Sequence, residues 1–218
     1  MTNIPELFAN NRAWSAQMAR NDPAFFSRLI AQQAPRYMWI GCSDSRVPAN
    51  EIVGLPPGEM FVHRNVANVV AHTDLNCLSA LQYAVDVLKV EHILITGHYG
   101  CGGVRAALDD RRYGLVDNWL RHVQDVAQQH EAELAALDGE ARVDRLCELN
   151  VAEQVLNTAR STVVQDCWIR SQPLSIHGCV YGLHDGIMRD LDSTVSEPGD
   201  VIALARRLHA GTYPTAVG

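Results

Sequence analysis

The stretch Trp39-Ile-Gly-Cys42-Ser-Asp44-Ser-Arg46 ends a short apolar run and places a thiol, a carboxylate and a guanidinium within five residues. A second stretch, His98-Tyr-Gly-Cys101-Gly-Gly, follows another apolar run, Ile93-Leu-Ile-Thr-Gly97. Short apolar runs of this kind predict buried strands of a covered parallel sheet, so each stretch lies where a strand ends. Ligands of such sheets bind beyond the carboxyl ends of the strands, and we expect the two stretches to meet there.

Together the two stretches supply the donor atoms of a zinc site. Cysteine thiolates and histidine nitrogens are usual zinc ligands, and a catalytic zinc keeps a fourth position open. Cys42, His98 and Cys101 fill three positions in this prediction and leave the fourth to water or to Asp44. Cys101 is expected near the start of a helix, where partial positive charge favours a thiolate. Asp44 can bind either metal or Arg46, which suggests a switchable site.

The remaining chain alternates apolar runs with helical patterns, which predicts an α/β fold with right-handed crossovers. The expected strands cover residues 37–40, 60–62, 92–97 and 174–181, in a central, mostly parallel sheet of order 2-1-3-4 flanked by helices. Helices are expected at 5–19, from Asn21-Asp22-Pro23 onward, from Asp74 to Leu88 with Leu75, Leu78, Leu81 and Val85 on the apolar face, after Gly103, over most of 115–164, and within 199–209.

Length and composition predict one domain over residues 1–218, with an N-terminal helical arm at 1–34 and a poorly anchored tail at 211–218. Phe8 and Trp14 lie on the arm helix, which packs either on its own domain or on a partner subunit. The 25 acidic residues outnumber the 18 Lys and Arg, which argues against nucleic acid or anionic membrane as a partner. The chain has no long apolar run and begins without a signal-peptide pattern, so a cytoplasmic location is expected.

The four other cysteines have no ligand-like neighbours at short spacing, and we expect Cys77, Cys147, Cys167 and Cys179 to be buried thiols. A redox pairing of Cys42 with Cys101 is the alternative to a metal site, although Asp44 and His98 would then have no role. A proton shuttle could be any of five further histidines: His63, His72, His92, His177 and His184.

The motifs carry a family resemblance. Cys42-x-Asp44-x-Arg46 combined with His98-x-x-Cys101-Gly-Gly resembles the β-class carbonic anhydrases, and the similarity extends through residues 61–68 and 147–151. Among them it resembles the bacterial enzymes most closely. The resemblance implies a Zn²⁺ cofactor and the reversible hydration of carbon dioxide to bicarbonate and a proton by zinc-bound hydroxide. It makes Asp44 and Arg46 the catalytic pair.

The same resemblance implies further roles and a homo-oligomer, either a dimer or a tetramer. The substrate pocket is expected to contain a set of residues that includes some from the partner subunit: Gln33, Phe61, Val66, Tyr83 and Gly102. A second, non-catalytic bicarbonate site is expected at Trp39, Arg64 and Tyr181. Bicarbonate there would move the loop around Val47 and break the Asp44–Arg46 pair, so that Asp44 displaces the zinc-bound water.

Two alternative functions remain open from the sequence. The same metal site could hydrolyse carbon disulfide or carbonyl sulfide, since relatives with that activity look similar at the metal. The chain could also be a structural or redox-sensing zinc protein without turnover, in which Asp44 stays on the metal at every pH.

Overall fold

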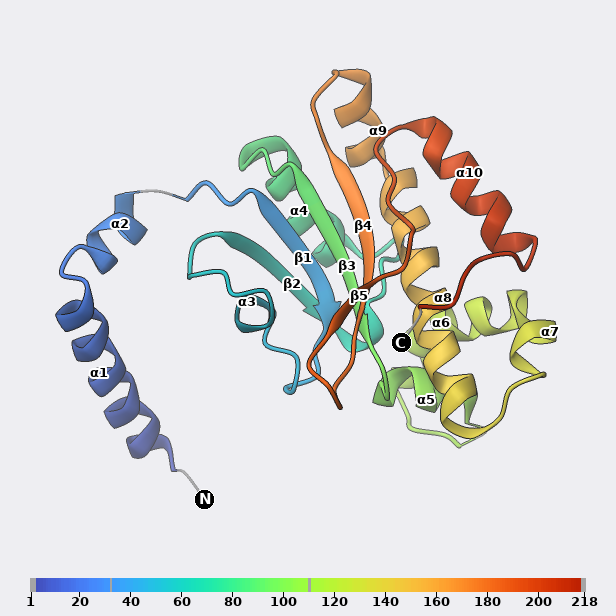
Figure 1. The fold of residues 1–218 in the computed structure, drawn as a ribbon, viewed down its shortest axis with the longest axis horizontal. Coiled ribbons are helices and arrows are strands. Elements are labelled where there is room, and N and C mark those ends of the chain that lie inside the picture. The colour runs from blue at the N-terminus through green and yellow to red at the C-terminus, as the bar shows by residue number, and fades with distance from the viewer. Residues whose placement is uncertain (1–2, 32, 110, 217–218) are drawn as a thin grey trace. The chain divides into compact units, whose positions relative to one another are not determined.

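The computed structural model describes residues 3–31, 33–109 and 111–216, and the chain divides into two compact units, residues 1–34 and 35–218. The first unit contains helices α1 (Ile4–Asn21) and α2 (Phe25–Ala31) (Figure 1). Asn3 caps α1 through reciprocal hydrogen bonds with Glu6. The second helix begins at Phe25, after a turn in which the Asp22 carboxylate accepts the Ala24 N–H, as expected of a capping residue.

A five-stranded sheet of order β2-β1-β3-β4-β5 forms the centre of the second unit. Its strands are β1 (Tyr37–Cys42), β2 (Met60–Asn65), β3 (His92–His98), β4 (Ser175–Tyr181) and β5 (Met188–Asp190). The first four pair in parallel and confirm the expected order, while β5 adds an antiparallel edge. Three residues are too few for hydrophobic periodicity to predict a strand, so β5 was not expected.

Helices follow or cover the strands. In chain order they are α3 (Ala49–Ile52), η1 (Val66–Asn68), α4 (Leu75–Gln82), η2 (Tyr83–Val87, a π-helix), α5 (Gly102–Leu108), α6 (Val116–Gln129), α7 (Glu131–Leu134), α8 (Gly139–Arg160), α9 (Thr162–Ile169) and α10 (Pro198–His209). No helix among the described residues combines the length and the apolar character that a membrane crossing needs.

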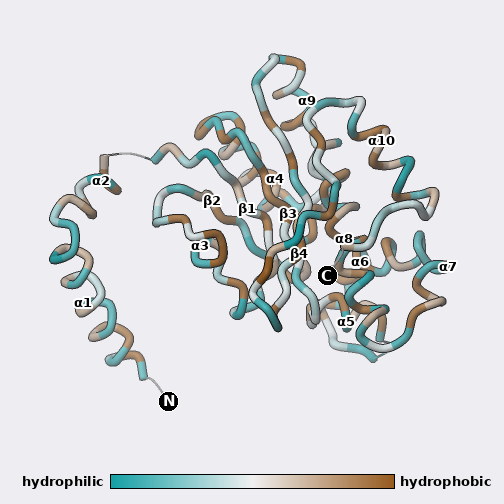
Figure 2. The backbone as a smooth tube through the Cα atoms, in the orientation of Figure 1, coloured by the Kyte–Doolittle hydropathy of each residue, from teal (hydrophilic) through white to brown (hydrophobic). Residues whose placement is uncertain are grey.

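The two faces of the sheet bury cores of different size. Met38 and Ile40 of β1 point into the large core, which the helix α8 covers, while Trp39 belongs to a smaller cluster near α3. Figure 2 shows hydrophobic residues along the central strands. Gly97 lets α8 approach β3, because a Cβ there would lie 2.6 Å from Cγ2 of Val151. This close packing fixes the end of β3, where His98 begins the predicted site.

One expected core position is wrong. Leu75 does not face the core but is 77% exposed, whereas Cys77, Leu81 and Ala84 are fully buried. Leu81 and Val85 are fully buried and Leu78 packs against the core, as expected, so the error is confined to Leu75 in the first turn of α4.

The tail is anchored as far as residue 216. Tyr213 is 4% exposed, and its hydroxyl donates to the Leu191 carbonyl at 2.7 Å. Its ring lies under the guanidinium groups of Arg145 and Arg207. A single aromatic residue among small and polar neighbours gave no periodic signal of burial. Residues 217–218 lie outside the described part of the chain.

Candidate metal centre

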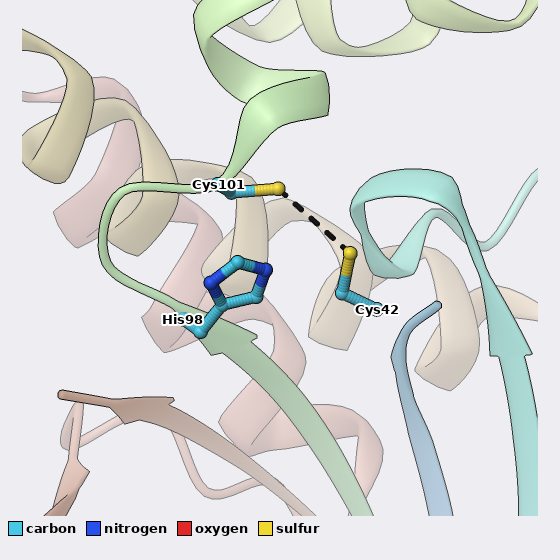
Figure 3. A group of neighbouring side chains, drawn as sticks. All are labelled: Cys42, His98 and Cys101. Carbon is cyan, nitrogen blue, oxygen red and sulfur yellow. Dashed lines mark hydrogen bonds between the residues drawn. The ribbon is translucent and has the colours of Figure 1, made fainter. Parts of the chain in front are cut away.

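The predicted ligands meet at the carboxyl edge of the sheet. Cys42 is the last residue of β1 and His98 the last residue of the neighbouring strand β3. Cys101 follows three residues later, at the N-cap position of α5. Figure 3 shows the two sulfur atoms and the imidazole turned toward one another. The three side chains are buried, and their donor atoms all lie within 4.8 Å of one another.

The geometry of these donors fits zinc. The Sγ atoms of Cys42 and Cys101 are 3.8 Å apart. Two sulfurs held about 2.3 Å from one tetrahedral zinc would be separated by about 3.8 Å. His98 Nδ1 donates to the Tyr99 carbonyl at 3.0 Å, which leaves the lone pair on Nε2, and this buried atom has no hydrogen-bond partner among the described residues. The site therefore presents two thiols and one free imidazole nitrogen to a single ion.

The two thiols ionise as a coupled pair. The hydrogen bond with Cys101, together with contacts to His98 and the backbone amides of Ala67 and Asp44, outweighs burial and lowers the pKa of Cys42 to about 4. The same hydrogen bond and deep burial raise the pKa of Cys101, although it stands at a helix start as expected. The pair therefore carries one thiolate, which can bind a cation. Binding of a metal ion would displace the remaining thiol proton, so that both sulfurs become ligands.

Asp44 and Arg46 form the predicted pair beside the ligands. Arg46 Nε donates to Asp44 Oδ1 at 2.9 Å and Nη2 donates to Oδ2 at 2.7 Å, and the Arg46 backbone N–H also donates to Oδ1. These bonds hold the pKa of Asp44 well below its usual range. Asp44 Oδ2 lies 3.7 Å from His98 Nε2. The carboxylate is thus ionised, turned to Arg46, and next to the open side of the donor set.

Arg64 holds the loop that carries Asp44. Its Nε donates to the Cys42 carbonyl at 2.9 Å and its Nη2 to the Asp44 carbonyl at 2.7 Å. Trp39 is fully buried, and its indole N–H has no hydrogen-bond partner in the described part of the chain. Tyr181 and Val47 belong to the same apolar cluster as Trp39. The three residues of the expected bicarbonate site therefore lie on β1, β2 and β4, with β3 between β1 and β4, and Arg64 is bonded to the metal-site loop.

The expected pocket residues fall into separate places. Val66 lies near α5, because a Cβ on Gly103 would approach Val66 Cγ1 to 2.7 Å. Phe61 and Tyr83 contact each other, with ring centroids 5.9 Å apart. Phe61 is in register with Met38, four residues before Cys42, which is about 13 Å along the strand. Phe61 and Tyr83 therefore do not reach the metal site of their own chain.

Two further pocket residues complete the expected set. Gly102 is the exposed first residue of α5, directly after the ligand Cys101. Gln33 belongs to the first unit, whose placement relative to the site is not described.

A second group of potential ligands suits a metal less well. His63, Asp74 and Cys77 also bring donor atoms within 4.8 Å of one another. Asp74 already serves as the cap of α4, accepting the Asn76 N–H at 3.0 Å. Burial raises the pKa of the Cys77 thiol to about 12, so this thiol is a poor ligand. As expected, Cys77, Cys147, Cys167 and Cys179 are all buried free thiols.

Helix α8 supplies two contacts to the His98–Cys101 turn that the sequence analysis missed. Glu148 accepts the Tyr99 hydroxyl at 2.7 Å, and Asp144 accepts the Gly100 N–H at 3.1 Å. The available signal was chemical rather than periodic, since Glu148 interrupts an otherwise apolar stripe of the helix.

Comparison with known proteins agrees with this site. The carbonic anhydrase family model matches residues 37–188. A carbonic anhydrase of Emericella nidulans is 50% identical over 189 residues, which cover 86% of this chain and 82% of that protein. The solved Coccomyxa β-carbonic anhydrase in complex with acetazolamide is 37% identical, with a TM-score of 0.89 and coverage of 99% of this chain and 100% of that one.

A tetrameric β-carbonic anhydrase of the ascomycete Sordaria macrospora is 39% identical, with a TM-score of 0.84, and covers 87% of this chain and 97% of its own. The relative at 50% identity is fungal, so the expected closeness to the bacterial enzymes is not confirmed. The matches span most of both chains and agree with the donor set at the strand ends. The chain belongs to the β class of the carbonic anhydrase family.

Proposed function

We propose that the protein hydrates carbon dioxide reversibly to bicarbonate and a proton, with one Zn²⁺ held by Cys42, His98 and Cys101. The observation that carries the proposal is the donor set itself, two sulfurs 3.8 Å apart beside a free imidazole nitrogen. When bound, zinc supplies a Lewis acid that makes water a nucleophile near neutral pH. Because two thiolates cancel its formal charge, we expect activity displaced toward alkaline pH.

Asp44 orients the reacting water in this proposal. Its carboxylate is ionised and turned to Arg46, and Oδ2 lies 3.7 Å from the ligand atom of His98. From there it can accept a hydrogen bond from the water and direct a lone pair toward the substrate. Arg46 keeps the carboxylate ionised and away from the metal position by its two side-chain bonds.

Carbon dioxide has no net dipole, so its pocket should be mainly apolar. Val66 and Gly102 are the proposed pocket residues of the same chain, since both lie beside Cys101 or α5. We assign Phe61, Tyr83 and Gln33 to the pocket of a neighbouring subunit. The distance between Phe61 and the metal site of its own chain supports that assignment. The assignment requires a homo-oligomer, as in the tetrameric relative.

A bicarbonate-regulated form of the enzyme is supported by the contacts of Arg64. An anion at Trp39, Arg64 and Tyr181 would meet an unpartnered indole N–H and would compete for the guanidinium. That guanidinium now holds the carbonyls of Cys42 and Asp44. Losing those bonds would release the loop, and Asp44, freed from Arg46, would become the fourth metal ligand and close the site.

Substitution of Arg64 tests this regulation. Arg64→Ala also removes the bonds to the Cys42 and Asp44 carbonyls, so its basal rate should fall, but added bicarbonate should inhibit it several-fold less than wild type while zinc content stays at one per chain. Bicarbonate inhibition that is unchanged in the variant would refute the regulatory site, whatever the basal rate.

The main function is tested by stopped-flow hydration of carbon dioxide with zinc content measured in parallel. Cys42→Ser should lose both zinc and activity. Cys77→Ser is the matched control, because Cys77 is the buried thiol of the other donor group, and it should keep both. Carbonyl sulfide and carbon disulfide are assayed alongside. Turnover of these alone would make the protein a hydrolase of sulfur analogues, and zinc binding without any turnover would make it a structural or redox zinc protein.

A further inference from the structure

The turn between His98 and Cys101 is held by three hydrogen bonds that do not involve the ligand side chains. The Tyr99 N–H donates to the Tyr181 carbonyl at 3.0 Å, and the Gly100 N–H to Asp144. The third bond is that of the Tyr99 hydroxyl to Glu148 Oε1. In this bond the Tyr99 hydroxyl is the donor and the carboxylate the acceptor. The carbonyl of Tyr99 in turn accepts from His98 Nδ1 and orients the ligand imidazole.

Glu148 belongs to a buried ion pair with Arg145. Both residues are 4% exposed, and Arg145 Nη1 donates to Glu148 Oε2 at 2.7 Å. Arg145 Nε donates to Glu133 at 2.6 Å. A buried pair of this kind is stable only when its other donors and acceptors are also satisfied.

The C-terminal segment satisfies them. Arg145 Nη2 donates to the Tyr213 carbonyl at 2.7 Å, and Nη1 donates to the Pro214 carbonyl at 3.0 Å. The Ala216 N–H donates to Glu148 Oε1 at 3.3 Å, the same oxygen that receives the Tyr99 hydroxyl. Tyr213 is itself buried and its hydroxyl donates to the Leu191 carbonyl, which fixes the position of the segment.

We propose that residues 213–216 are a positioning element of the metal centre. These residues shield the Arg145–Glu148 ion pair from water. The shielded Glu148 holds the Tyr99 hydroxyl in place, and the Tyr99 carbonyl holds the imidazole of His98 in place. None of these residues touches substrate. Without the segment, Arg145 loses two acceptors, Glu148 loses one donor, and both reorient toward the solvent that enters. The metal-side part of this inference rests on the proposed zinc site.

The test compares zinc release in four forms of the full holoenzyme: wild type, Tyr99→Phe, a chain ending at Thr212, and the combination of the two changes. A chromogenic chelator in excess reports the release rate. Each single change should speed release about 10-fold, the usual effect of losing a partner of a metal ligand. The combined form should release zinc no faster than the faster single form, because both changes act through one hydrogen bond.

The control and the fallback variant are chosen from the chain itself. Tyr113→Phe removes a hydroxyl bonded to Asp109 at 2.9 Å on the surface, and it should leave release unchanged. If the shortened chain fails to fold, the Ala216→Pro variant takes its place in the comparison, because this substitution removes the N–H that donates to Glu148. Unchanged release in Tyr99→Phe, or effects that multiply in the combined form, would overturn the proposal.

Amide exchange separates this inference from the proposed function. In zinc-free protein, the Tyr99 and Gly100 amides should exchange faster in the shortened chain and in Tyr99→Phe than in wild type. A wild-type protein that binds no zinc would refute the zinc site, yet the exchange would still report the coupling of the tail to the turn. Exchange that is the same in all forms would refute the positioning role even with zinc bound.

Discussion

At the scale of single residues, the backbone alone brings Cys42 and His98 together, because they end neighbouring parallel strands. That is why the ligand set could be predicted from sequence. Few residue types bind zinc, and an apolar run in the sequence predicts where a buried strand ends. The Tyr99–Glu148 contact could not be predicted, because it depends on which side of α8 faces the turn. Hydrophobic periodicity marks the buried face of a helix but not the rare charged residue within it.

Arg46 gives a prediction at this scale. Arg46→Ala should reduce kcat/KM about 10- to 100-fold with zinc content unchanged, because Asp44 loses the two bonds that aim its carboxylate. Arg36→Ala is the matched control. Arg36 is as exposed as Arg46 and pairs with Glu91 at the far end of β1. An Arg46→Ala enzyme with wild-type kcat/KM would show that Asp44 needs no partner.

Among the elements, the four parallel strands were predictable, since apolar runs alternate with helical patterns, whereas that alternation alone does not fix their order in the sheet. The exposure of Leu75 was not predictable, because this residue begins α4 and the 3.6-residue period does not show where a helix leaves the core. The π-helix after α4 could not be predicted either, since no residue type announces it. The contact of the C-terminal segment with α8 could not be predicted from the sequence either. Arg145 binds backbone carbonyls of that segment, and any residues at those positions would offer the same carbonyls.

Gly103 tests the contact between α5 and the loop at Val66. A Cβ at this position would lie 2.7 Å from Val66 Cγ1 and 3.2 Å from the Ala67 Cβ. Gly103→Ala should therefore lower the free energy of unfolding by about 1–3 kcal/mol, measured by denaturant titration. Gly102→Ala is the neighbouring control, since its Cβ would meet nothing within 4 Å. Equal stability of the two variants would mean that the loop moves aside freely.

Glu153 on α8 joins this helix to α10. It is 6% exposed and accepts from His209 Nε2 at 3.0 Å, while His130 Nε2 lies 3.9 Å away. Burial alone would raise the pKa of Glu153, but the hydrogen bond with His209 and the nearby imidazole of His130 outweigh it and the pKa is lowered. The stability gained from the carboxylate is therefore complete above its unfolded pKa of about 4.3 and is lost as pH falls through the folded value.

Glu153→Gln should accordingly destabilise the protein by about 1–3 kcal/mol at pH 7 and by much less below pH ~4. Denaturant titrations at the two pH values measure the difference. Glu131→Gln, on the exposed side of α7, should change stability little at either pH. If Glu153→Gln lowers the free energy of unfolding as much in acid as at pH 7, then Glu153 stabilises the protein by packing rather than by its charge.

At the scale of the whole molecule, the N-terminal helix is informative. None of the residues of α1 is buried, and Ile4, Leu7 and Phe8 are each more than half exposed. An isolated helix gains little stability in water without a surface for its apolar residues, and a second copy of the chain would supply one. The sequence pattern alone left this helix undecided between its own domain and a partner subunit.

Deleting residues 1–34 should therefore yield a smaller species in sedimentation velocity than the full chain. The unit of residues 35–218 should keep its secondary structure in circular dichroism, because its core contains none of the deleted residues. An unchanged sedimentation coefficient after correction for mass would place the subunit interface elsewhere.

The zinc coordination is the central claim for the whole molecule, and X-ray absorption at the zinc edge of the purified holoenzyme measures it most directly. The structure predicts two sulfur neighbours at about 2.3 Å and one imidazole nitrogen at about 2.0 Å, with the fourth neighbour an oxygen. Cys42→Ser should abolish this spectrum, and Cys77→Ser should leave it unchanged. A first shell of four sulfurs, a shell with no sulfur, or a two-sulfur shell lost in Cys77→Ser would contradict the assignment of Cys42, His98 and Cys101 as the ligands.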